Sequence, residues 1–275
     1  MSLSSRARAR IEEIAAELTR FPETEVRRAL LGDESSPLHA CLHIATDGGF
    51  RATYAPFDWI NDQADIILIG ITPGFRQAAD ALTILRRHLV AGTTVEAAAK
   101  AAKESASFKG MRALAAQLMD SLNLASVFGL SSCDDLFEAA AWRVHSTSIL
   151  RYPVFKNGKN FSGDKRILNR RLMYAMIEEH LVPELASLPK AWLVPFGSSA
   201  LAVLEELATR GVVDRDRLLG GVLHPGGQQW NRYNIQLGIT TGDAALAVPG
   251  GREVLLRSAA LREKAAQIVS LRRAA

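Results

Sequence analysis

Several features are scarce or missing in this chain of 275 residues. It holds only two cysteines, Cys41 and Cys133, and neither belongs to a Cys-x-x-Cys pair. We therefore expect no disulfide framework, and an iron–sulfur cluster held by four cysteines is excluded. No apolar run approaches the roughly 20 residues that cross a bilayer, and no apolar segment typical of a signal peptide follows the first ten residues. These absences predict a cytoplasmic protein without a membrane partner.

The motifs of several common enzyme classes are also missing. The sequence has neither the Gly-x-x-x-x-Gly-Lys-Ser/Thr pattern of a P-loop nor the Gly-x-Ser-x-Gly elbow of a hydrolase. His39 and His43 are four residues apart, but the sequence offers no third ligand for a metal beside them. We therefore expect neither a metal nor a cofactor. The net charge of +4 permits contacts with phosphate groups but does not require them.

The pattern of apolar residues predicts an α/β fold. Short apolar runs that suit buried strands alternate with helical stretches, as in the β-α-β units of a parallel sheet. We predict a three-layer αβα sandwich around a four-stranded, mainly parallel sheet, formed by one domain. Its core would be residues 50–240, with helical additions at 1–49 and 241–275. The expected strands are 66–69, 142–150, 192–196 and 218–223, and the clearest expected helices are 4–20, 200–210 and 253–271, with Ser198 or Ser199 as an N-cap.

Two glycine- and proline-containing turns carry the strongest functional signal. The segment Gly70-Ile71-Thr72-Pro73-Gly74 follows the first expected strand, and His224-Pro225-Gly226-Gly227 follows the last. In open α/β sheets, ligands bind at the carboxyl ends of the strands. Backbone N–H groups of the first turn could receive an anion or a carbonyl, and His224 could donate a hydrogen bond to a leaving group. The alternative interpretations are a tight connection without a ligand and a histidine satisfied within its own loop.

Together the two turns resemble the two signature motifs of the uracil-DNA glycosylase superfamily. The resemblance covers roughly residues 50–240 and includes the strand–glycine–helix unit at 192–200 and the strand at 144–150. It implies a fold of the uracil-DNA glycosylase type and an enzyme of DNA repair. Such an enzyme flips a damaged base, such as uracil or a deaminated purine, out of DNA and hydrolyses its N-glycosidic bond.

The resemblance also implies roles for individual residues. His224 matches the histidine that stabilises the departing base, and Thr72 stands where the family has an Asp or Asn that positions the attacking water. Phe75 is the candidate ring that stacks on the base. The remaining base-binding positions would be Gly70, Ile71, Pro73, Gly74 and Ser148, and the loop that enters DNA would include Gly226, Gly227, Trp230 and Arg232. Trp230 could instead cover the core beneath its loop.

Three positions depart from the family pattern. Thr72 replaces the Asp or Asn, Ser148 stands where several families place an Asn that reads the pyrimidine, and Gly226 replaces a Ser. A threonine hydroxyl can hold a water but cannot act as a base at neutral pH. Asp58 or Asp164 could supply a carboxylate instead, or could be an ordinary turn or cap residue.

The segment 155–163 interleaves basic, amide and aromatic residues. Lys156 and Lys159 could contact phosphates, and Phe155 or Phe161 could contact a base. The alternative is a surface turn set by Asn157-Gly158. We expect a monomer with DNA as its partner. Two further hypotheses stay open, a protein that binds a nucleobase or nucleic acid without cleaving it, and an enzyme that uses the same fold on a small nucleoside-like molecule.

Overall fold

The computed structural model describes residues 3–274, and the chain divides into two compact units, each built from several segments. Unit 1 consists of the segment that ends at Gln63 together with Ile71–Lys109 and His145–Pro189. Unit 2 consists of Ala64–Gly70, Gly110–Val144 and the segment from Lys190 onward. The two units are described in turn.

Unit 1 begins with the helix predicted over residues 4–20. Helix α1 is Ser5–Arg20, and the Ser4 side chain caps it by accepting a hydrogen bond from the Ala7 N–H. Ile11, Ile14 and Leu18 lie on one face and are fully buried. Helix α2 (Glu23–Leu31) ends at Gly32, whose φ of +89° is the left-handed C-cap conformation that favours glycine. A single helical turn, α3 (His39–Leu42), follows.

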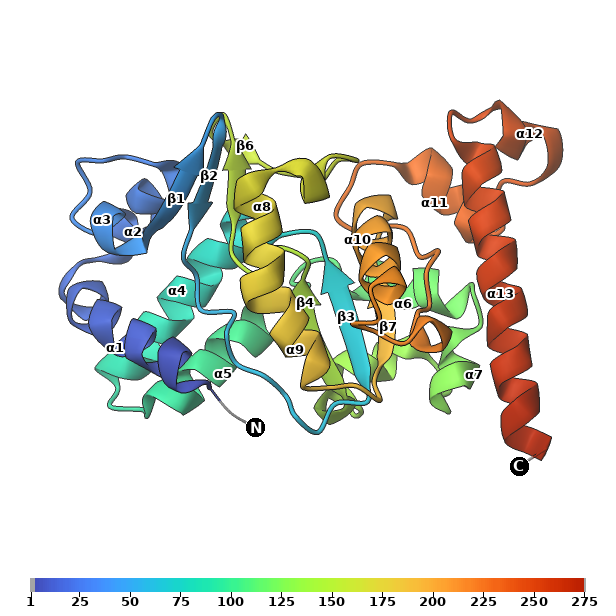
Figure 1. The fold of residues 1–275 in the computed structure, drawn as a ribbon, viewed down its shortest axis with the longest axis horizontal. Coiled ribbons are helices and arrows are strands. Elements are labelled where there is room, and N and C mark those ends of the chain that lie inside the picture. The colour runs from blue at the N-terminus through green and yellow to red at the C-terminus, as the bar shows by residue number, and fades with distance from the viewer. Residues whose placement is uncertain (1–2, 275) are drawn as a thin grey trace. The chain divides into compact units, whose positions relative to one another are not determined.

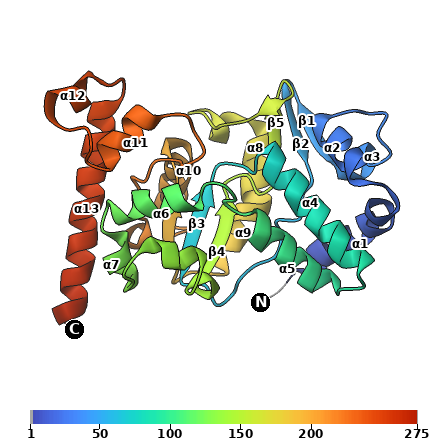
Figure 2. The same cartoon turned by 180° about the vertical axis from the view of Figure 1, so that it is seen from behind.

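Two alanine-rich helices form the next layer of unit 1 (Figure 2). Helix α4 is Phe75–Val90 and α5 is Val95–Ala106. The chain breaks between them, and the Thr94 side chain caps α5 by accepting from the Ala97 N–H. The small side chains of Ala98, Ala99 and Ala102 are fully buried, which allows the two helices to pack closely.

Unit 1 also contains an antiparallel sheet that the sequence pattern did not predict (Figure 1). Its strands, in the order β1-β2-β5-β6, are His43–Asp47, Phe50–Thr53, Val154–Lys156 and Lys159–Asn160. Asn157 and Gly158 join β5 to β6 with φ of +48° and +76°, the positive values that a two-residue type I′ hairpin turn requires. The turn proposed as the alternative for this segment is therefore present.

A helical stretch closes unit 1. It consists of α8 (Arg171–Met176), a π-helical turn η4 (Ile177–Leu181) and α9 (Val182–Ala186), and the short 3₁₀ turn η3 (Ile167–Asn169) precedes it. The π turn comes directly before the first turn of α9, which holds Pro183. Because proline has no N–H to donate and its ring clashes with the preceding turn, it disturbs the regular hydrogen-bond pattern there.

The parallel strands correct the predicted sheet. Strand β3 (Ile66–Gly70) pairs in parallel with β7 (Trp192–Pro195), from Ile66 opposite Trp192 to Ile69 opposite Pro195. The parallel sheet has three strands, in the order β4-β3-β7, where β4 is Val144–Ser148. The expectation of a central four-stranded sheet was therefore wrong.

The segment predicted as the fourth strand makes only isolated parallel bridges. Leu218 pairs with Leu193, and Val222 pairs with Phe196. Gly220 and Gly221 interrupt the segment, and Gly221 has a φ of +136° with backbone so close that an added Cβ would lie 3.0 Å from the Arg257 oxygen. A strand interior does not adopt this conformation, so an apolar composition was insufficient for a strand.

Helices make up the rest of unit 2. The long α13 (Gly251–Ala274) lies against α7 (Leu124–Phe128), α11 (Trp230–Gln236) and α12 (Gly242–Ala247) (Figure 1). The predicted serine N-cap of α10 (Ser198–Thr209) was wrong, because Gly197 is the N-cap, with a φ of +86°. A Cβ added at Gly197 would lie 3.1 Å from the Cβ of His224. The other helices of unit 2 are α6 (Arg112–Asp120), α7 (Leu124–Phe128), α10 (Ser198–Thr209), α11 (Trp230–Gln236) and α12 (Gly242–Ala247), with 3₁₀ turns η1 (Cys133–Phe137), η2 (Ala141–Arg143) and η5 (Arg215–Arg217).

Within residues 3–274, no helix combines the length and the apolar character needed to span a bilayer.

Candidate functional site

The first predicted turn follows β3 and is tied to the strand β5. The Thr72 hydroxyl donates to the Tyr152 carbonyl oxygen at 2.9 Å and accepts from the Val154 N–H at 3.0 Å. Because a hydroxyl has one proton, this proton is already used. Thr72 therefore has a structural role, and the water-positioning role that the resemblance implies for it stays a prediction.

The end of the same turn begins helix α4. The Gly74 N–H donates to Gln77 Oε1 at 3.1 Å, and the Phe75 N–H donates to Asn160 Oδ1 at 2.9 Å. The Gly74 N–H, one of those that we expected to face a ligand, and the next N–H along the chain are thus bonded to side chains. The contact from Asn160 brings the β5–β6 hairpin to this turn within unit 1.

The other base-binding candidates of the first turn differ in exposure. Ile71 and Pro73 are buried, whereas Phe75 and Ser148 are half-buried. The Ile71 carbonyl accepts from the Leu150 N–H at 3.0 Å, so the chain after Ser148 is fixed to the turn. Unit 1 therefore brings together the turn after Gly70, the end of β4 and the hairpin.

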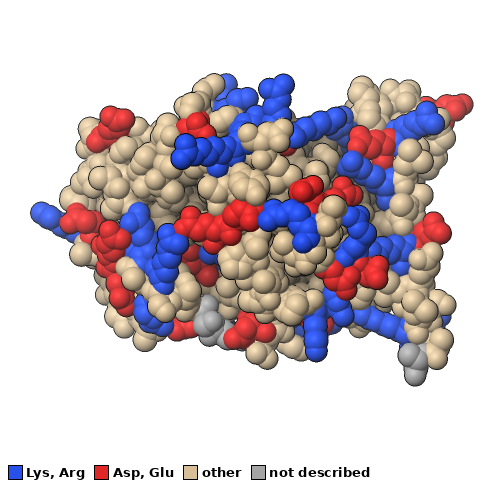
Figure 3. All heavy atoms as spheres, in the orientation of Figure 1, with Lys and Arg blue, Asp and Glu red and all other residues tan. Residues whose placement is uncertain are grey.

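The β5–β6 hairpin exposes its lysine side chains, whereas the aromatic rings of this segment are buried. Phe155 and Phe161 are buried, so neither ring is exposed for stacking on a base. Lys156 and Lys159 are exposed, and so are Lys165, Arg166 and Arg171 in the segment that follows. Figure 3 shows Lys and Arg side chains gathered over the part of unit 1 where Figure 1 places β6 and the chain beyond it. This surface suits phosphate groups.

Asp164, one of the two carboxylates considered as a base, is held by its neighbours. Both of its oxygens pair with the Arg170 guanidinium at 2.6 Å, and Oδ1 also accepts from the Arg166 N–H. The hydrogen bonds from Arg170 lower the pKa of Asp164 below its ordinary value. Asp164 therefore orders the chain before α8. The guanidinium carbon of Arg170 in turn lies 4.7 Å from the centre of the Phe50 ring.

His224 lies in unit 2 with one ring nitrogen bonded and the other available. Its Nδ1 accepts from the Gly226 N–H at 3.1 Å, so the proton of a neutral ring resides on Nε2. Burial lowers the pKa of His224 below 6.5, which favours that neutral form at pH 7. Among the residues that the structure describes, Nε2 has no hydrogen-bond partner. The alternative of a histidine satisfied within its loop accounts for only one of its two nitrogens.

A buried tyrosine fixes the loop that carries His224. The Tyr233 hydroxyl lies 2.9 Å from the His224 carbonyl oxygen and 2.6 Å from that of Gly227. The Gln229 side chain also donates to the His224 carbonyl at 3.3 Å. The histidine is therefore presented from a rigid loop, as a preorganised donor must be.

Close packing favours glycine at position 226. A Cβ added there would lie 2.6 Å from Met111 Sδ and 2.9 Å from the His224 ring. A serine there, which the resemblance to the uracil-DNA glycosylases would predict, would require the Met111 side chain or the His224 ring to move. Gly227 has more room, since its closest such contact would be 3.4 Å from Gln229.

Trp230 and Arg232 follow on α11. Trp230 is 62% exposed, and its ring meets the Tyr233 ring edge-on at 5.4 Å. Most of the indole is therefore in solvent rather than over the core. Arg232 is half-buried, and its Nε donates to the Pro249 carbonyl at 3.0 Å.

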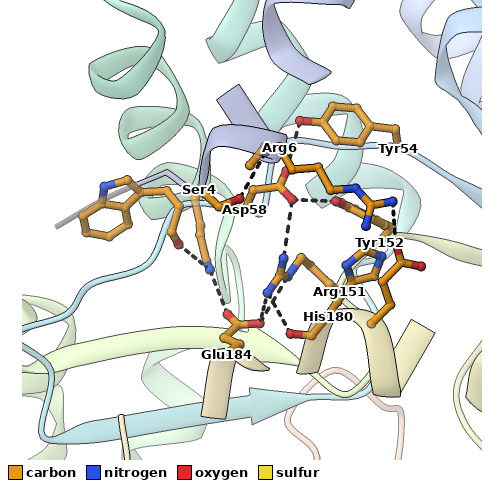
Figure 4. A network of polar contacts seen from close by, with 12 residues as sticks. Ser4, Arg6, Tyr54, Asp58, Arg151, Tyr152, His180 and Glu184 are labelled. Atoms are coloured by element: carbon orange, nitrogen blue, oxygen red, sulfur yellow. Dashed lines mark hydrogen bonds and ion pairs between the residues drawn. The ribbon is translucent and has the colours of Figure 1, made fainter. Parts of the chain in front are cut away.

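A buried polar network in unit 1 was not predicted from the sequence (Figure 4). Its centre is Glu184, whose side chain is fully buried. Glu184 Oε1 accepts from His145 Nε2 at 2.6 Å and lies 3.5 Å from Lys103 Nζ. Oε2 accepts from Arg151 at 2.7 Å. Asp58 completes the network by accepting from the hydroxyls of Tyr54 at 3.0 Å and Tyr152 at 2.5 Å.

Burial and charge set the protonation states of this network. Although burial alone would raise the pKa of Glu184, Arg151 and Lys103 hold it well below 4.5. Burial lowers the pKa of Lys103 to about 8 and that of His145 to about 4. His145 is therefore neutral at pH 7, with Nδ1 accepting from the Asn61 N–H at 3.3 Å and Nε2 donating to Glu184. Each buried charge has a partner of opposite sign.

No local sequence motif predicts this network. Asp58, Lys103, His145 and Glu184 are separated by about 40 residues at each step, and only their burial reveals them. Of the two carboxylates considered as a base, Asp58 belongs here, beneath two tyrosine hydroxyls. Within residues 3–274, no group of three or more His, Cys, Asp or Glu side chains is arranged to hold a metal ion.

Comparison with known proteins places the chain in a family. It is similar to the uncharacterized protein YoxB of Bacillus subtilis (strain 168), with 31% identity over 226 residues that cover 81% of this chain and 86% of YoxB. The chain belongs to the same family as YoxB. No protein-family model matches the chain, and no solved structure matches it.

Proposed function

We propose that this protein is a DNA glycosylase that hydrolyses the N-glycosidic bond of a flipped, damaged base such as uracil or a deaminated purine. The observation that carries the proposal is the state of His224. Its Nδ1 accepts a backbone N–H, burial favours the neutral ring, and Nε2 keeps its proton without a partner among the described residues. A neutral donor fixed on a rigid loop is what a departing base anion requires.

The chemistry assigned to His224 is stabilisation of the leaving group. As the bond between sugar and base breaks, negative charge develops on the base, and the Nε2 proton can bond to a base oxygen. One preorganised donor of this kind contributes about 10²–10³ in rate. Because the pKa of His224 is lowered, the ring is neutral at pH 7 and acts as a hydrogen-bond donor rather than as a general acid.

The surfaces of the two units support DNA as the substrate. In unit 1, exposed Lys156 and Lys159 lie on the hairpin whose Asn160 bonds the first turn. In unit 2, the exposed Trp230 follows the His224 loop and is large enough to occupy the gap that a flipped base leaves. We therefore assign phosphate contacts to the two lysines and assign to Trp230 the role of filling the gap in the DNA.

The test is base release from labelled single- and double-stranded oligonucleotides that carry uracil, hypoxanthine, xanthine or a mismatched base. We expect release from at least one substrate by the wild-type protein and its loss in His224→Ala. His88→Ala, on the last turn of α4, is the matched control and keeps its activity. Release by His224→Ala at the wild-type rate would remove His224 from the mechanism.

A second candidate function is binding of a flipped base without cleavage. The specific observation in its favour is that the single proton of the Thr72 hydroxyl is donated to the Tyr152 carbonyl. With one lone pair accepting from the Val154 N–H as well, Thr72 can hold a water only through its remaining lone pair, and a hydroxyl cannot take a proton from that water at neutral pH. Gel shifts separate the two functions, since tight binding to lesion-containing DNA without base release from any substrate would favour the binder.

A further inference from the structure

The stretch from Lys156 to Tyr174 in unit 1 concentrates positive charge. It holds six basic side chains and one carboxylate, Asp164, so its net charge of +5 exceeds the +4 of the whole chain. It comprises the end of β5, the strand β6, the turn η3 and the first turn of α8. Since the rest of the chain is close to neutral, this stretch dominates the attraction of the protein for anions.

These charges are not compensated within the protein. Asp164 is bonded to Arg170, and the five other cations form no ion pair within residues 3–274: Lys156, Lys159, Lys165, Arg166 and Arg171. The basic run at the start of unit 1 differs, since Arg6, Arg8 and Arg10 of α1 each pair with a glutamate. All five uncompensated side chains are exposed, and Figure 3 shows Lys and Arg gathered where Figure 1 places β6.

An exposed aromatic ring lies at the end of this stretch. Tyr174 is 44% exposed on α8, three residues after Arg171, so the two side chains share a face of the helix. Within the described part of the chain, the Tyr174 hydroxyl makes no hydrogen bond and its ring contacts no other ring or cation. The other large apolar side chains exposed in unit 1 are aliphatic, namely Leu31, Ile44 and Val90. Tyr174 thus offers a free aromatic face beside a guanidinium.

We propose that the surface from Lys156 to Tyr174 binds a single strand of nucleic acid, with its cations on the phosphates and the Tyr174 ring stacked on one base. Phosphates account for the excess of cations, and stacking accounts for an exposed ring that packs on nothing. A single strand is favoured because paired bases inside a duplex present no face to such a ring. An acidic peptide would use the cations but not the ring.

The choice of a nucleic acid as partner rests on the proposed function, to which the surface adds the form of the strand and the stacking residue. The two can fail separately. An oligodeoxythymidine carries no damaged base, so its binding does not require base release. His224→Ala should therefore bind it as the wild-type protein does.

The test is fluorescence anisotropy of a labelled oligodeoxythymidine of about 15 nucleotides, titrated with the full chain at several salt concentrations. The stacking variant is Tyr174→Ala, and its matched control is Tyr174→Phe, which keeps the ring. The charge variant replaces Arg166 and Arg171 with glutamine. Its matched control makes the same replacement at Arg20 and Arg27, which are exposed arginines of α1 and α2.

We expect Tyr174→Ala to bind the oligonucleotide about tenfold more weakly at every salt concentration, and Tyr174→Phe to bind like the wild-type protein. The Arg166 and Arg171 double variant lowers the slope of log affinity against log salt by about 1.4, because two phosphate contacts are lost. The control double variant keeps the wild-type slope. Tyr174→Ala should not weaken binding to a duplex of the same length.

The proposal is overturned if the wild-type protein does not bind the oligonucleotide at about 100 μM, if Tyr174→Ala binds it as tightly as the wild type, or if the two arginine pairs have equal effects. Loss of binding in His224→Ala would place the strand at the His224 loop instead. Polyglutamate or phosphatidylserine vesicles that bind with the same dependence on Tyr174 would also overturn it, because neither contains bases. Binding without base release from any substrate would contradict the glycosylase alone.

Discussion

Glu184 compensates two buried cations at once, Arg151 and Lys103. Its side chain is fully buried, and those of Lys103 and Arg151 are 3% and 11% exposed. Desolvation of three charges is costly, so the network stabilises the fold only as long as it remains complete. At the scale of single residues, its loss should therefore be among the most damaging changes in unit 1.

Glu184→Gln should lower the free energy of unfolding by about 3–5 kcal/mol, because it leaves Arg151 and Lys103 without their carboxylate. Urea denaturation measures this loss. The matched control is Glu179→Gln, which removes an ion pair whose side chains are 43% and 81% exposed and should cost no more than about 1 kcal/mol. Equal losses in the two variants would show that the buried network does not carry this stability.

His145 should make the fold sensitive to mild acid. Its pKa is about 4 in the folded protein and 6.5 ordinarily, so between these values the unfolded chain binds a proton that the folded chain does not. Stability therefore falls as pH decreases from 6.5 to about 4, by up to about 3 kcal/mol. Glu184 contributes only below about pH 4.5, where its carboxylate is protonated in the unfolded chain.

The measurement is urea unfolding across this pH range for the wild-type protein and for His145→Gln, which cannot titrate. The variant should be less stable at pH 7 but should lose less stability on acidification. His88→Ala should retain the wild-type slope. If the free energy of unfolding of His145→Gln changed with pH as steeply as that of the wild type, the assignment of a neutral buried His145 would be contradicted.

At the scale of elements, Thr72 joins the turn after β3 to strand β5 through two backbone groups. Thr72→Val keeps the shape but leaves the Tyr152 carbonyl and the Val154 N–H without this partner. We expect a loss of about 1–3 kcal/mol on urea unfolding, the cost of an unsatisfied buried group. Thr72→Ser retains the hydroxyl and should keep stability and base release. Wild-type stability in Thr72→Val would show that the bonds do not hold the turn.

The β5–β6 hairpin should contribute to the salt dependence of DNA binding. If Lys156 and Lys159 each contact a phosphate, replacing both with glutamine reduces the slope of log affinity against log salt by about 1.4–1.8. The lower value applies to single-stranded DNA and the upper value to double-stranded DNA, so both kinds of oligonucleotide are measured. The same replacement at Lys100 and Lys190, which lie outside the hairpin, should leave the slope unchanged. An unchanged slope in the hairpin variant would place the phosphate contacts elsewhere.

Elements with a long or regular pattern were predictable. The helix over residues 4–20 has a capping serine and one apolar face, and the strand at 66–69 is an uninterrupted apolar run. The antiparallel sheet was missed because its strands span only two to five residues and alternate poorly. The segment 218–223 was mistaken for a full strand because its two glycines break a pattern that is otherwise apolar.

At the scale of the whole molecule, each compact unit is assembled from segments that are distant in the sequence. The two motif turns were predictable because each is a contiguous segment next to an apolar run. The Glu184 network was not, because its members come from the loop before β3, from α5, from β4 and from α9. Burial of this kind arises only after these segments have packed.

The central claim is that His224 stabilises a departing base. The most direct measurement is the single-turnover rate of base release from the best DNA substrate by the wild-type protein, His224→Ala and His88→Ala. The account predicts that His224→Ala is slower by about 10²–10³ and that His88→Ala is unchanged. A wild-type rate in His224→Ala, or no release of any base by the folded wild-type protein, would contradict it.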